Sequence, residues 1–347
     1  MELGKQTNVL LYGLGPIGIQ ILKNCLETNS VNVIGAVDID PNKVGVDIGV
    51  LAGKDPVGIL VVSNLEEVNQ AQLEGEKVAL HATGSNVAVV EPQFEALLNQ
   101  GYSVVSTCEQ LSYPWYRHPQ ASKRIDQLAR EKKLTVVGTG INPGFVMDSL
   151  AVFATTVTHS IRGIYVSRKV DVSKRRIPLQ QKVGIGMTPE EFLALAVEDK
   201  IGHVGLEESL RLIGYGLNLT LNEVRNSTVP TIASTDTEVA LGPINKGAVN
   251  GMHQISSALT SEGFPIELDL IMSVDIQQED RVRIALKGQD DLQIVIPGGI
   301  FGDTATANVM LNTAKTISSS QNMGLLTMVD IPLVRNANYG VISSVTS

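Results

Sequence analysis

The feature that most constrains this fold is a glycine-rich turn, GLGPIG, which follows the apolar run NVLLY and precedes a helical pattern. Gly13 permits a tight turn after a strand, and Gly15 lets a phosphate group approach the backbone. Gly18 lets the following helix pack closely on the strand. Pro16 and Ile17, between these glycines, complete the candidate cofactor-binding segment. Because backbone N–H groups at a helix start attract anions, the segment predicts a dinucleotide site in an α/β fold.

An acidic residue occupies the position that such a site requires. Asp38 ends the next apolar run, VNVIGAV, 20 positions beyond Gly18, where a carboxylate can accept hydrogen bonds from ribose hydroxyls. Asp38 favours NAD, since a 2′-phosphate would meet a like charge, whereas Lys43 keeps NADP open. We therefore expect NAD or NADP as cofactor. The simpler alternative is a glycine turn followed by a surface aspartate.

Short apolar runs alternate with amphipathic segments through the first 145 residues. Six runs have the length of strands: NVLLYGLG, VNVIGAVD, GILVV, VALHATG, YSVVSTCE and LTVVGTG. They are apolar on both faces, as parallel strands covered by helices must be. The pattern predicts a Rossmann-type, doubly wound parallel sheet.

The pattern changes after residue 150. IELDLIMSVDI and RVRIALKG alternate apolar with polar residues, which indicates an antiparallel sheet with one solvated face. TPEEF at 188–192 predicts a helix that starts with a capping box, and TATANVMLNTAKTI predicts a long final helix. We place a dinucleotide-binding domain at 1–147, to which a C-terminal segment from about 318 to 347 returns. An α+β substrate and dimerisation domain with a largely antiparallel sheet then spans 148–317.

Composition narrows the possible partners. A net charge of −9 and an aromatic content of 4% argue against nucleic acid, which is bound through clustered cations and stacking aromatic rings. No apolar run approaches the roughly 20 residues of a membrane helix. Cys25 and Cys108 lack the spacing of a metal site or a disulfide framework. We expect a cytoplasmic protein without a metal.

The segment HATGS, at 81–85, ends the fourth apolar run on the edge where open α/β sheets bind ligands. Thr83, Gly84 and Ser85 are therefore candidates for the path of the cofactor, although a plain strand-to-helix turn is the alternative. His81 lies within the apolar strand, and we interpret it as a core histidine rather than a ligand.

The segment VVSTCEQLSYPW, at 104–115, places a carboxylate at the end of the fifth strand. Glu109 stands there without the lysine that many two-domain dehydrogenases of this build carry beside such a glutamate. A carboxylate in a partly dry pocket suits proton transfer and complements a positively charged nitrogen. The alternative is that Glu109 caps a helix or pairs with an arginine.

Four segments carry a resemblance to a known family. TCEQLSYPW, GTGINPGFVMD at 138–148, GHVGLEES at 202–209 and GDTATANVMLN at 302–312 resemble the 2,4-diaminopentanoate dehydrogenases and the related native amine dehydrogenases. The resemblance implies NAD(P)-dependent oxidative deamination of a primary amine, or reductive amination of a ketone or aldehyde with ammonia. It also implies that Glu109 is the catalytic acid/base and that the chain forms a homodimer. The first domain also resembles dihydrodipicolinate reductases, whose paired-histidine signature is missing here.

The same resemblance implies further site residues. Asn142, Pro143 and Gly144 should flank the nicotinamide, and Phe145 should line the substrate pocket. An ordinary turn that opens a helix at Asp148 is the alternative. The other candidate pocket residues are Tyr165, Arg168, His203, Thr304, Thr306 and Asn308. Period-two alternation would send Tyr165 and Arg168 to opposite faces of a strand. His203 either reaches the pocket or caps the helix that begins near Leu206.

Two other functions stay open at the level of sequence. One is an NAD(P)-dependent reductase of a carbonyl or imine intermediate in biosynthesis, which an arginine or lysine aimed at a substrate carboxylate would favour. The other is a non-catalytic protein that senses NAD(H).

Overall fold

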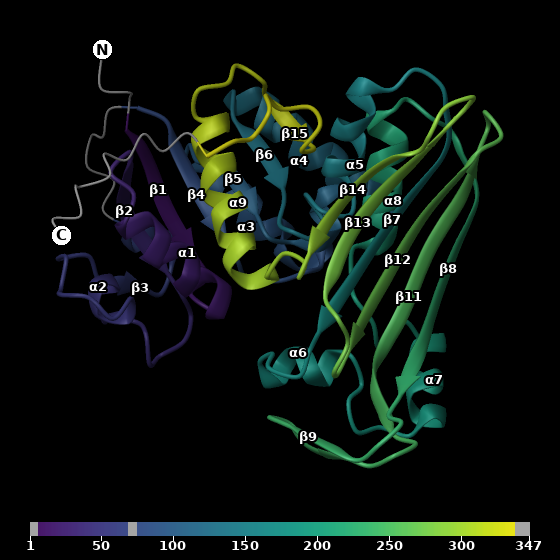
Figure 1. The fold of residues 1–347 in the computed structure, drawn as a ribbon. Coiled ribbons are helices and arrows are strands. Elements are labelled where there is room, and N and C mark those ends of the chain that lie inside the picture. The colour runs from purple at the N-terminus through teal and green to yellow at the C-terminus, as the bar shows by residue number, and fades with distance from the viewer. Residues whose placement is uncertain (1–5, 69–74, 337–347) are drawn as a thin grey trace, which may run out of the picture. The chain divides into compact units, whose positions relative to one another are not determined.

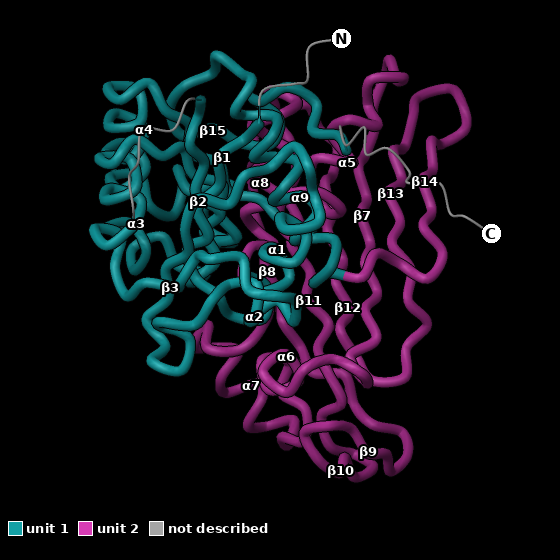
Figure 2. Tube along the Cα trace, turned by 90° about the vertical axis from the view of Figure 1, so that its left-hand side faces the viewer, with its two compact units in different colours: residues 1–141, 302–347 teal, residues 142–301 magenta. Residues whose placement is uncertain are grey.

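A computed structural model describes residues 6–68 and 75–336 of the chain (Figure 1). The chain folds into two compact units (Figure 2). Unit 1 comprises residues 1–141 and 302–347, and unit 2 comprises residues 142–301. The chain therefore leaves unit 1, builds unit 2 and then returns.

Unit 1 contains a seven-stranded sheet in which all neighbouring strands run parallel. In spatial order its strands are β15 (Gly324–Leu326), β6 (Thr135–Gly138), β5 (Ser103–Ser106), β4 (Lys77–His81), β1 (Thr7–Tyr12), β2 (Val31–Val37) and β3 (Val61–Val62). The six apolar runs of the first half each supply one strand, which confirms the doubly wound sheet. The seventh strand comes from the end of the chain.

Helices cover both faces of this sheet. One face packs against α1 (Pro16–Leu26), α2 (Ile48–Leu51) and α9 (Gly302–Ile317), and the other packs against α3 (Val87–Asn99) and α4 (Pro119–Lys132). Two short 3₁₀ helices, η1 (Leu65–Glu67) and η2 (Glu109–Ser112), complete the unit among the described residues. Because side chains alternate along a strand, the sheet has a separate apolar core on each face: Val9 and Leu11 face α1, while Leu10 faces α3.

The structure corrects the sequence-based boundaries. The chain returns to unit 1 at Gly302 rather than near residue 318, because α9 buries Met310 and Ala314 in the same core as Leu22 of α1. The passage into unit 2 comes after Ile141 rather than after residue 147. Residues 337–347 of the returning segment lie outside the described part of the chain.

Unit 2 is built on a mixed six-stranded sheet. Its spatial order is β14 (Leu292–Pro297), β13 (Glu279–Leu286), β7 (Ile161–Asp171), β12 (Pro265–Ser273), β11 (Val249–Thr260) and β8 (Leu221–Ile232). All neighbours are antiparallel except β12 and β7, which confirms a largely antiparallel sheet. Strands β12 and β13 are consecutive along the chain, yet β7 lies between them. A separate hairpin joins β9 (Thr237–Val239) to β10 (Gly242–Ile244).

Five helical segments accompany this sheet among the described residues of unit 2. They are α5 (Ser149–Ala154), η3 (Thr155–Val157), α6 (Ile177–Lys182), α7 (Pro189–Val197) and α8 (Leu206–Gly216). Three of them, α5, α7 and α8, pack against the strands of the sheet, with α8 lying against β11 and β12. The predicted capping box of α7 is present: Thr188 Oγ1 accepts from Glu191 N at 3.2 Å, and Thr188 N donates to the Glu191 carboxylate at 2.9 Å. Such reciprocal bonds satisfy the backbone groups that the first helical turn leaves open.

Candidate active site

The glycine loop follows β1 directly and has the close contacts that its sequence predicts. Gly13 has φ +93°, and a Cβ at this position would lie 2.7 Å from the carbonyl oxygen of Ala82. A Cβ on Gly18 would lie 2.0 Å from the Gly13 carbonyl oxygen. By contrast, a Cβ on Gly15 would meet no atom of the described residues within 4 Å. Protein packing therefore requires two of the glycines, whereas Gly15 keeps space open at the N-terminus of α1, where a pyrophosphate would approach.

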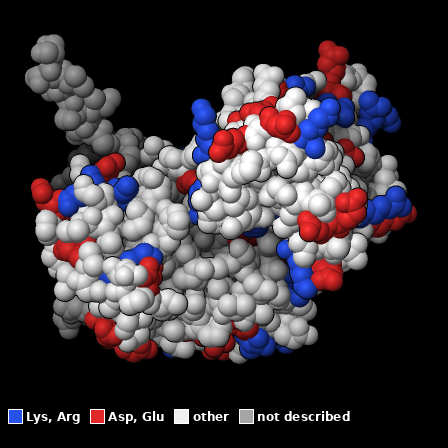
Figure 3. All heavy atoms as spheres, turned by 90° about the horizontal axis from the view of Figure 1, so that it is seen from below, with Lys and Arg blue, Asp and Glu red and all other residues white. Residues whose placement is uncertain are grey.

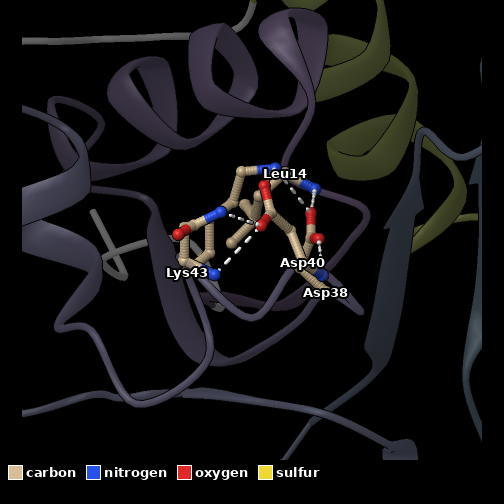
Figure 4. Close-up of polar contacts among 5 residues, drawn as sticks. Leu14, Asp38, Asp40 and Lys43 are labelled. Carbon is tan, nitrogen blue, oxygen red and sulfur yellow. Dashed lines mark hydrogen bonds and ion pairs between the residues drawn. The ribbon is translucent and has the colours of Figure 1, made fainter.

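Asp38 follows β2 and binds the backbone of this loop (Figure 4). Its Oδ2 accepts a hydrogen bond from Leu14 N at 2.6 Å, and its Oδ1 accepts one from Asp40 N at 2.8 Å. Lys43 Nζ lies 3.4 Å from Asp38 Oδ2 and 3.2 Å from Asp40 Oδ2. The Asp38 carboxylate is thus fixed beside the glycine loop, and two acids share the charge of Lys43.

Residues 83–85 follow β4 and lie next to the glycine loop, since a Cβ on Gly13 would come within 2.8 Å of Thr83 Cγ2. Thr83 Oγ1 donates a hydrogen bond to Gln93 Oε1 of α3 at 2.7 Å. Thr83, Gly84 and Ser85 therefore stand at the carboxyl edge of the sheet, beside the turn that follows β1.

Glu109 is the first residue of η2, three positions after the end of β5, and it is partly buried. A Cβ on Gly138 of β6 would lie 2.4 Å from the carbonyl carbon of Leu111, so η2 packs directly on the neighbouring strand. Ser112 Oγ donates to the Glu109 carbonyl oxygen at 2.8 Å. The candidate acid is therefore carried by a short helical turn that is held against β6.

Gln110, the neighbour of Glu109, makes contacts that sequence analysis did not identify. Its Oε1 accepts hydrogen bonds from Val87 N at 3.1 Å and from His118 Nε2 at 2.7 Å. Its backbone N donates to the Ser85 carbonyl oxygen at 3.3 Å. Burial lowers the pKa of His118. Because the Gln110 amide oxygen only accepts, His118 Nε2 carries the hydrogen of this bond. The one sequence feature that pointed to Gln110 was its polar side chain directly after Glu109.

A second group of candidate residues belongs to unit 2 and begins with the cis peptide bond between Asn142 and Pro143. Asp148 is completely buried and caps α5, as the turn interpretation expected. It also accepts from Gly144 N at 2.8 Å and from Ser209 Oγ of α8 at 2.7 Å. Burial raises the pKa of Asp148. Asn142 Oδ1 is buried without a hydrogen-bond partner among the described residues, so this turn presents an acceptor that a ligand amide could satisfy.

His203 is held against the same turn. Its Nε2 lies 2.9 Å from the Asn142 carbonyl oxygen, and its backbone N donates to Gln254 Oε1 at 3.0 Å. Because a carbonyl oxygen only accepts, the hydrogen sits on Nε2, which leaves Nδ1 as an acceptor. Burial lowers the pKa of His203 to about 3, so the ring is neutral at pH 7. Helix α8 begins at Leu206 with Gly205 as its N-cap, so the alternative role of His203 as a helix cap is wrong.

Tyr165 and Arg168 lie on opposite faces of β7, as alternation predicts. Arg168 is buried on one face, where Nη1 lies 2.7 Å from Asp280 Oδ2 and Nη2 donates to the Ile300 carbonyl oxygen at 2.8 Å. The Tyr165 ring lies on the other face, 3.9 Å from the guanidinium carbon of Arg283. The interactions of Arg168 in the structure are thus with groups of the protein itself.

The remaining candidates divide between the units. Phe145 is partly buried in unit 2, directly after the turn at Asn142. Thr304, Thr306 and Asn308 lie on α9 and so belong to unit 1. Asn308 is exposed, and its Oδ1 accepts from Asn24 Nδ2 of α1 at 2.8 Å.

Charged groups do not gather into a metal or polyanion site within the described ranges. There, no three His, Cys, Asp or Glu side chains come together as a metal would require. On the face seen in Figure 3, basic and acidic side chains of these residues alternate rather than forming a broad basic patch of the kind that nucleic-acid binders carry. No helix in the described ranges has both the length and the apolar character needed to cross a membrane.

Residues 145–346 match the family model of the 2,4-diaminopentanoate dehydrogenase C-terminal domain. The chain is 25% identical over 342 residues to 2,4-diaminopentanoate dehydrogenase from Acetoanaerobium sticklandii, with 95% of each chain covered.

Solved structures share the two-unit fold. An amine dehydrogenase from Mycobacterium smegmatis superposes with a TM-score of 0.82 at 23% identity, covering 96% of this chain and 98% of that one. A scyllo-inositol dehydrogenase from Lactobacillus casei, solved with NAD(H) and scyllo-inositol, gives a TM-score of 0.56 at 13% identity, with 90% and 88% covered. At these identities the structural likeness establishes the fold.

Proposed function

The chain belongs to the 2,4-diaminopentanoate dehydrogenase family, and we propose that it is an NAD(P)-dependent amine dehydrogenase. It would catalyse oxidative deamination of a primary amine and, in reverse, reductive amination of a ketone or aldehyde with ammonia. The observation that carries the proposal is the placement of Glu109. This carboxylate is partly buried on η2 after β5, and β5 is separated only by β4 from β1, the strand that precedes the glycine loop.

The residues present fit a dinucleotide. Gly15 leaves room for the pyrophosphate at the start of α1, and Asp38 lies beside the loop with a carboxylate suited to ribose hydroxyls. Ile39, directly after Asp38, is 89% exposed, and the face of an adenine ring would cover such an apolar side chain. The buried, unpartnered Asn142 Oδ1 suits the amide of a nicotinamide. When bound, the dinucleotide would supply or accept the hydride.

Glu109 would handle the protons of the reaction. As a carboxylate it takes a proton from ammonium, so that neutral ammonia can attack the carbonyl carbon. As a carboxylic acid it returns that proton to the carbinolamine hydroxyl, which leaves as water. The carboxylate formed again then stabilises the cationic iminium that is reduced to the amine. Each proton that Glu109 takes up is released in the next step, so one residue can serve the whole sequence.

Asp38 favours NAD over NADP in this proposal. A 2′-phosphate would approach the Asp38 carboxylate, which already binds two backbone N–H groups and cannot turn away without losing them. Lys43 could offset that repulsion only by giving up part of its pairing with Asp38 and Asp40. The arrangement therefore supports NAD as the preferred cofactor, with NADP as a weaker one.

Unit 2 would supply the pocket for the organic substrate. His203 Nδ1 is a neutral acceptor that could receive a hydrogen bond from the substrate amine, and Phe145 could provide an apolar wall. Tyr165 lies on the opposite face of β7 from Arg168 and is not part of this proposed pocket. Arg168 does not favour the alternative carbonyl or imine reductase, since its guanidinium is paired with Asp280 rather than directed at a substrate carboxylate.

We also propose a homodimer formed through the sheet face of unit 2 that carries Tyr165. This face includes three partly exposed apolar residues, Val229, Leu259 and Val295, which are 40 to 43% exposed. Sedimentation velocity of the purified protein tests the assembly, and Val229→Lys should shift it toward the monomer.

One assay tests the function. The protein is mixed with NADH or NADPH, concentrated ammonium and a panel of ketones and aldehydes, and nicotinamide absorbance is followed. Consumption that requires ammonium supports an amine dehydrogenase, whereas consumption without ammonium supports a carbonyl reductase. Cofactor binding without turnover on any substrate would instead identify an NAD(H) sensor.

Glu109→Gln tests the acid/base role. This variant should lose turnover while it retains cofactor affinity, because the amide keeps the shape of the side chain but cannot carry the proton. Glu131→Gln is the matched control, since it removes the same charge from the exposed surface of α4 in the same unit. Turnover by Glu109→Gln at the control's rate would exclude Glu109 from the mechanism.

A further inference from the structure

His81, the last residue of β4, is a buried polar residue that the proposed chemistry leaves unused. Its side chain is completely buried. The ring stacks on Tyr12 of β1 with centroids 5.6 Å apart and meets the edge of Phe94 of α3 at 4.8 Å. The interpretation of His81 as a core histidine is therefore confirmed. Both ring nitrogens nevertheless bind polar partners in segments that border the candidate site.

The first of these bonds leads toward Glu109. Ser106 ends β5, and its Oγ accepts a hydrogen bond from Cys108 N at 3.0 Å. The Ser106 hydroxyl can then donate its own hydrogen to His81 Nδ1, which lies 2.8 Å away. The Cys108 amide immediately precedes η2, so this chain of bonds ends at the residue before Glu109.

The second ring nitrogen faces α3 and the end of β4. His81 Nε2 lies 2.7 Å from Gln93 Oε1 and 2.9 Å from Thr83 Oγ1, and the Thr83 hydroxyl donates to Gln93 Oε1. With the hydrogen of the ring on Nε2, every donor in the network has an acceptor. Burial lowers the pKa of His81 to about 4, so this neutral form persists through the range in which enzymes are assayed.

We propose that His81, acting through Ser106, is a positioning residue that fixes the start of η2 and thereby holds Glu109 in place for proton transfer. The proposal rests on the proposed function, because that function gives Glu109 its role. Neither His81 nor Ser106 touches the reacting atoms. They act by tying the backbone before Glu109 to the centre of the sheet, where β1, β4 and β5 lie side by side (Figure 1).

A histidine suits this position for a physical reason. The ring accepts at one edge and donates at the other, while its faces pack between aromatic neighbours. Phenylalanine would preserve the packing but would remove the acceptor of the Ser106 hydroxyl and one of the two donors to Gln93 Oε1. Glutamine would restore both bonds, because its amide has one acceptor and one donor end.

Strand β5 offers a matched pair of variants for the test. Ser103 and Ser106 lie at opposite ends of the strand, both are buried, and each accepts a backbone N–H, Ser103 from Thr135 N at 3.1 Å. Ser103→Ala and Ser106→Ala should therefore lower the melting temperature by similar amounts. Only Ser106→Ala should lower kcat, by about 10- to 100-fold for a displaced catalytic group, with cofactor affinity little changed.

Two further measurements separate positioning from general stability. The acidic limb of the pH profile of kcat should move in Ser106→Ala but not in Ser103→Ala, because only the first change alters the surroundings of Glu109. Among His81 variants, kcat should fall in His81→Phe and recover in His81→Gln.

Nitrogen-15 spectra of histidine-labelled protein give a readout that is independent of turnover. The His81 signal, assigned by its loss in His81→Phe, should be that of a neutral ring protonated on Nε2. It should shift in Ser106→Ala and stay in place in Ser103→Ala.

The outcomes distinguish the two proposals. If the wild-type protein shows no ammonium-dependent turnover, the proposed function fails, while the spectra still report the hydrogen-bond network. If the wild type turns over and Ser106→Ala has the same kcat and pH profile as Ser103→Ala, the positioning role is overturned. A His81 signal with the hydrogen on Nδ1 would also overturn it.

Discussion

Gly138→Ala should impair turnover by moving Glu109. A Cβ at position 138 of β6 would lie 2.4 Å from the Leu111 carbonyl carbon and 2.6 Å from Ser112 N, both backbone atoms of η2. Unlike a side chain, these backbone atoms cannot relieve the overlap by adopting another rotamer. The separation must therefore grow from 2.4 Å to about 3.5 Å, which moves η2 by about 1 Å. A shift of about 1 Å in a catalytic group lowers the rate by about 100-fold, equivalent to about 2.7 kcal/mol in the barrier.

Gly35→Ala is the control for this experiment. Gly35 lies in β2 of the same sheet, and its new Cβ would meet side chains, 2.8 Å from Val68 Cγ1 and 3.1 Å from Leu10 Cδ1. Both variants overpack the core and should lose about 1–3 kcal/mol of unfolding free energy. Urea unfolding measures that loss, and steady-state kinetics with saturating cofactor measures kcat. The reasoning is refuted if Gly138→Ala unfolds at a lower urea concentration yet turns over as fast as Gly35→Ala.

Three other predictions follow from the contacts described. Asp38→Ala should weaken NAD binding by about 10- to 100-fold, which is the contribution of a hydrogen bond to a charged group, and should improve the relative use of NADP. Asp40→Ala is the control. An unchanged cofactor preference in Asp38→Ala would contradict the role of Asp38 in binding the ribose. Removing Arg168 should cost about 3–5 kcal/mol, because Arg168→Met leaves Asp280 charged and buried. Adding Asp280→Leu should recover much of that loss in urea unfolding, whereas removing the exposed Arg225–Glu223 pair should cost less than about 1 kcal/mol. The third prediction concerns pH. Because the pKa of His81 is lowered to about 4 in the folded protein, the unfolded chain binds one more proton than the folded chain between pH 6.5 and 4. The unfolding free energy should therefore fall by about 1.4 kcal/mol per pH unit as the pH is lowered from 6.5 toward 4. His203 adds to this slope down to about pH 3, and titrations that give equal slopes for the wild type and His81→Gln would disprove the assignment for His81.

The sequence predicted those parts of the fold that local pattern determines. The glycine loop, the six parallel strands and the capping box at Thr188 all depend on residues close together in the chain, and the structure contains each of them. Sequence spacing also indicated that Tyr165 and Arg168 would lie on opposite faces of a strand. These features follow from backbone geometry, which is fixed over a few residues.

Other features depend on long-range packing and could not be predicted from spacing. The apolar pattern of α9 shows that one face is buried but does not specify the sheet against which it packs, so the helix was assigned to the wrong unit. The insertion of β7 between β12 and β13 likewise depends on pairing across a long stretch of chain. Gly138 gave no local sign that a helical turn approaches it. The partners of Gln110 come from two separate segments, and those of His81 come from three.

The order of the two units along the chain has a consequence for biosynthesis. A ribosome delivers β1 to β6 first, but α9 and β15, which complete their sheet, emerge only after the whole of unit 2. Until then β6 has an unpaired edge, and the apolar surface that later meets Met310 and Ala314 is exposed to solvent. Exposed apolar surface and free strand edges promote aggregation. The nascent protein therefore depends on its last residues to close its first unit, and a chain released before α9 would leave that unit incomplete.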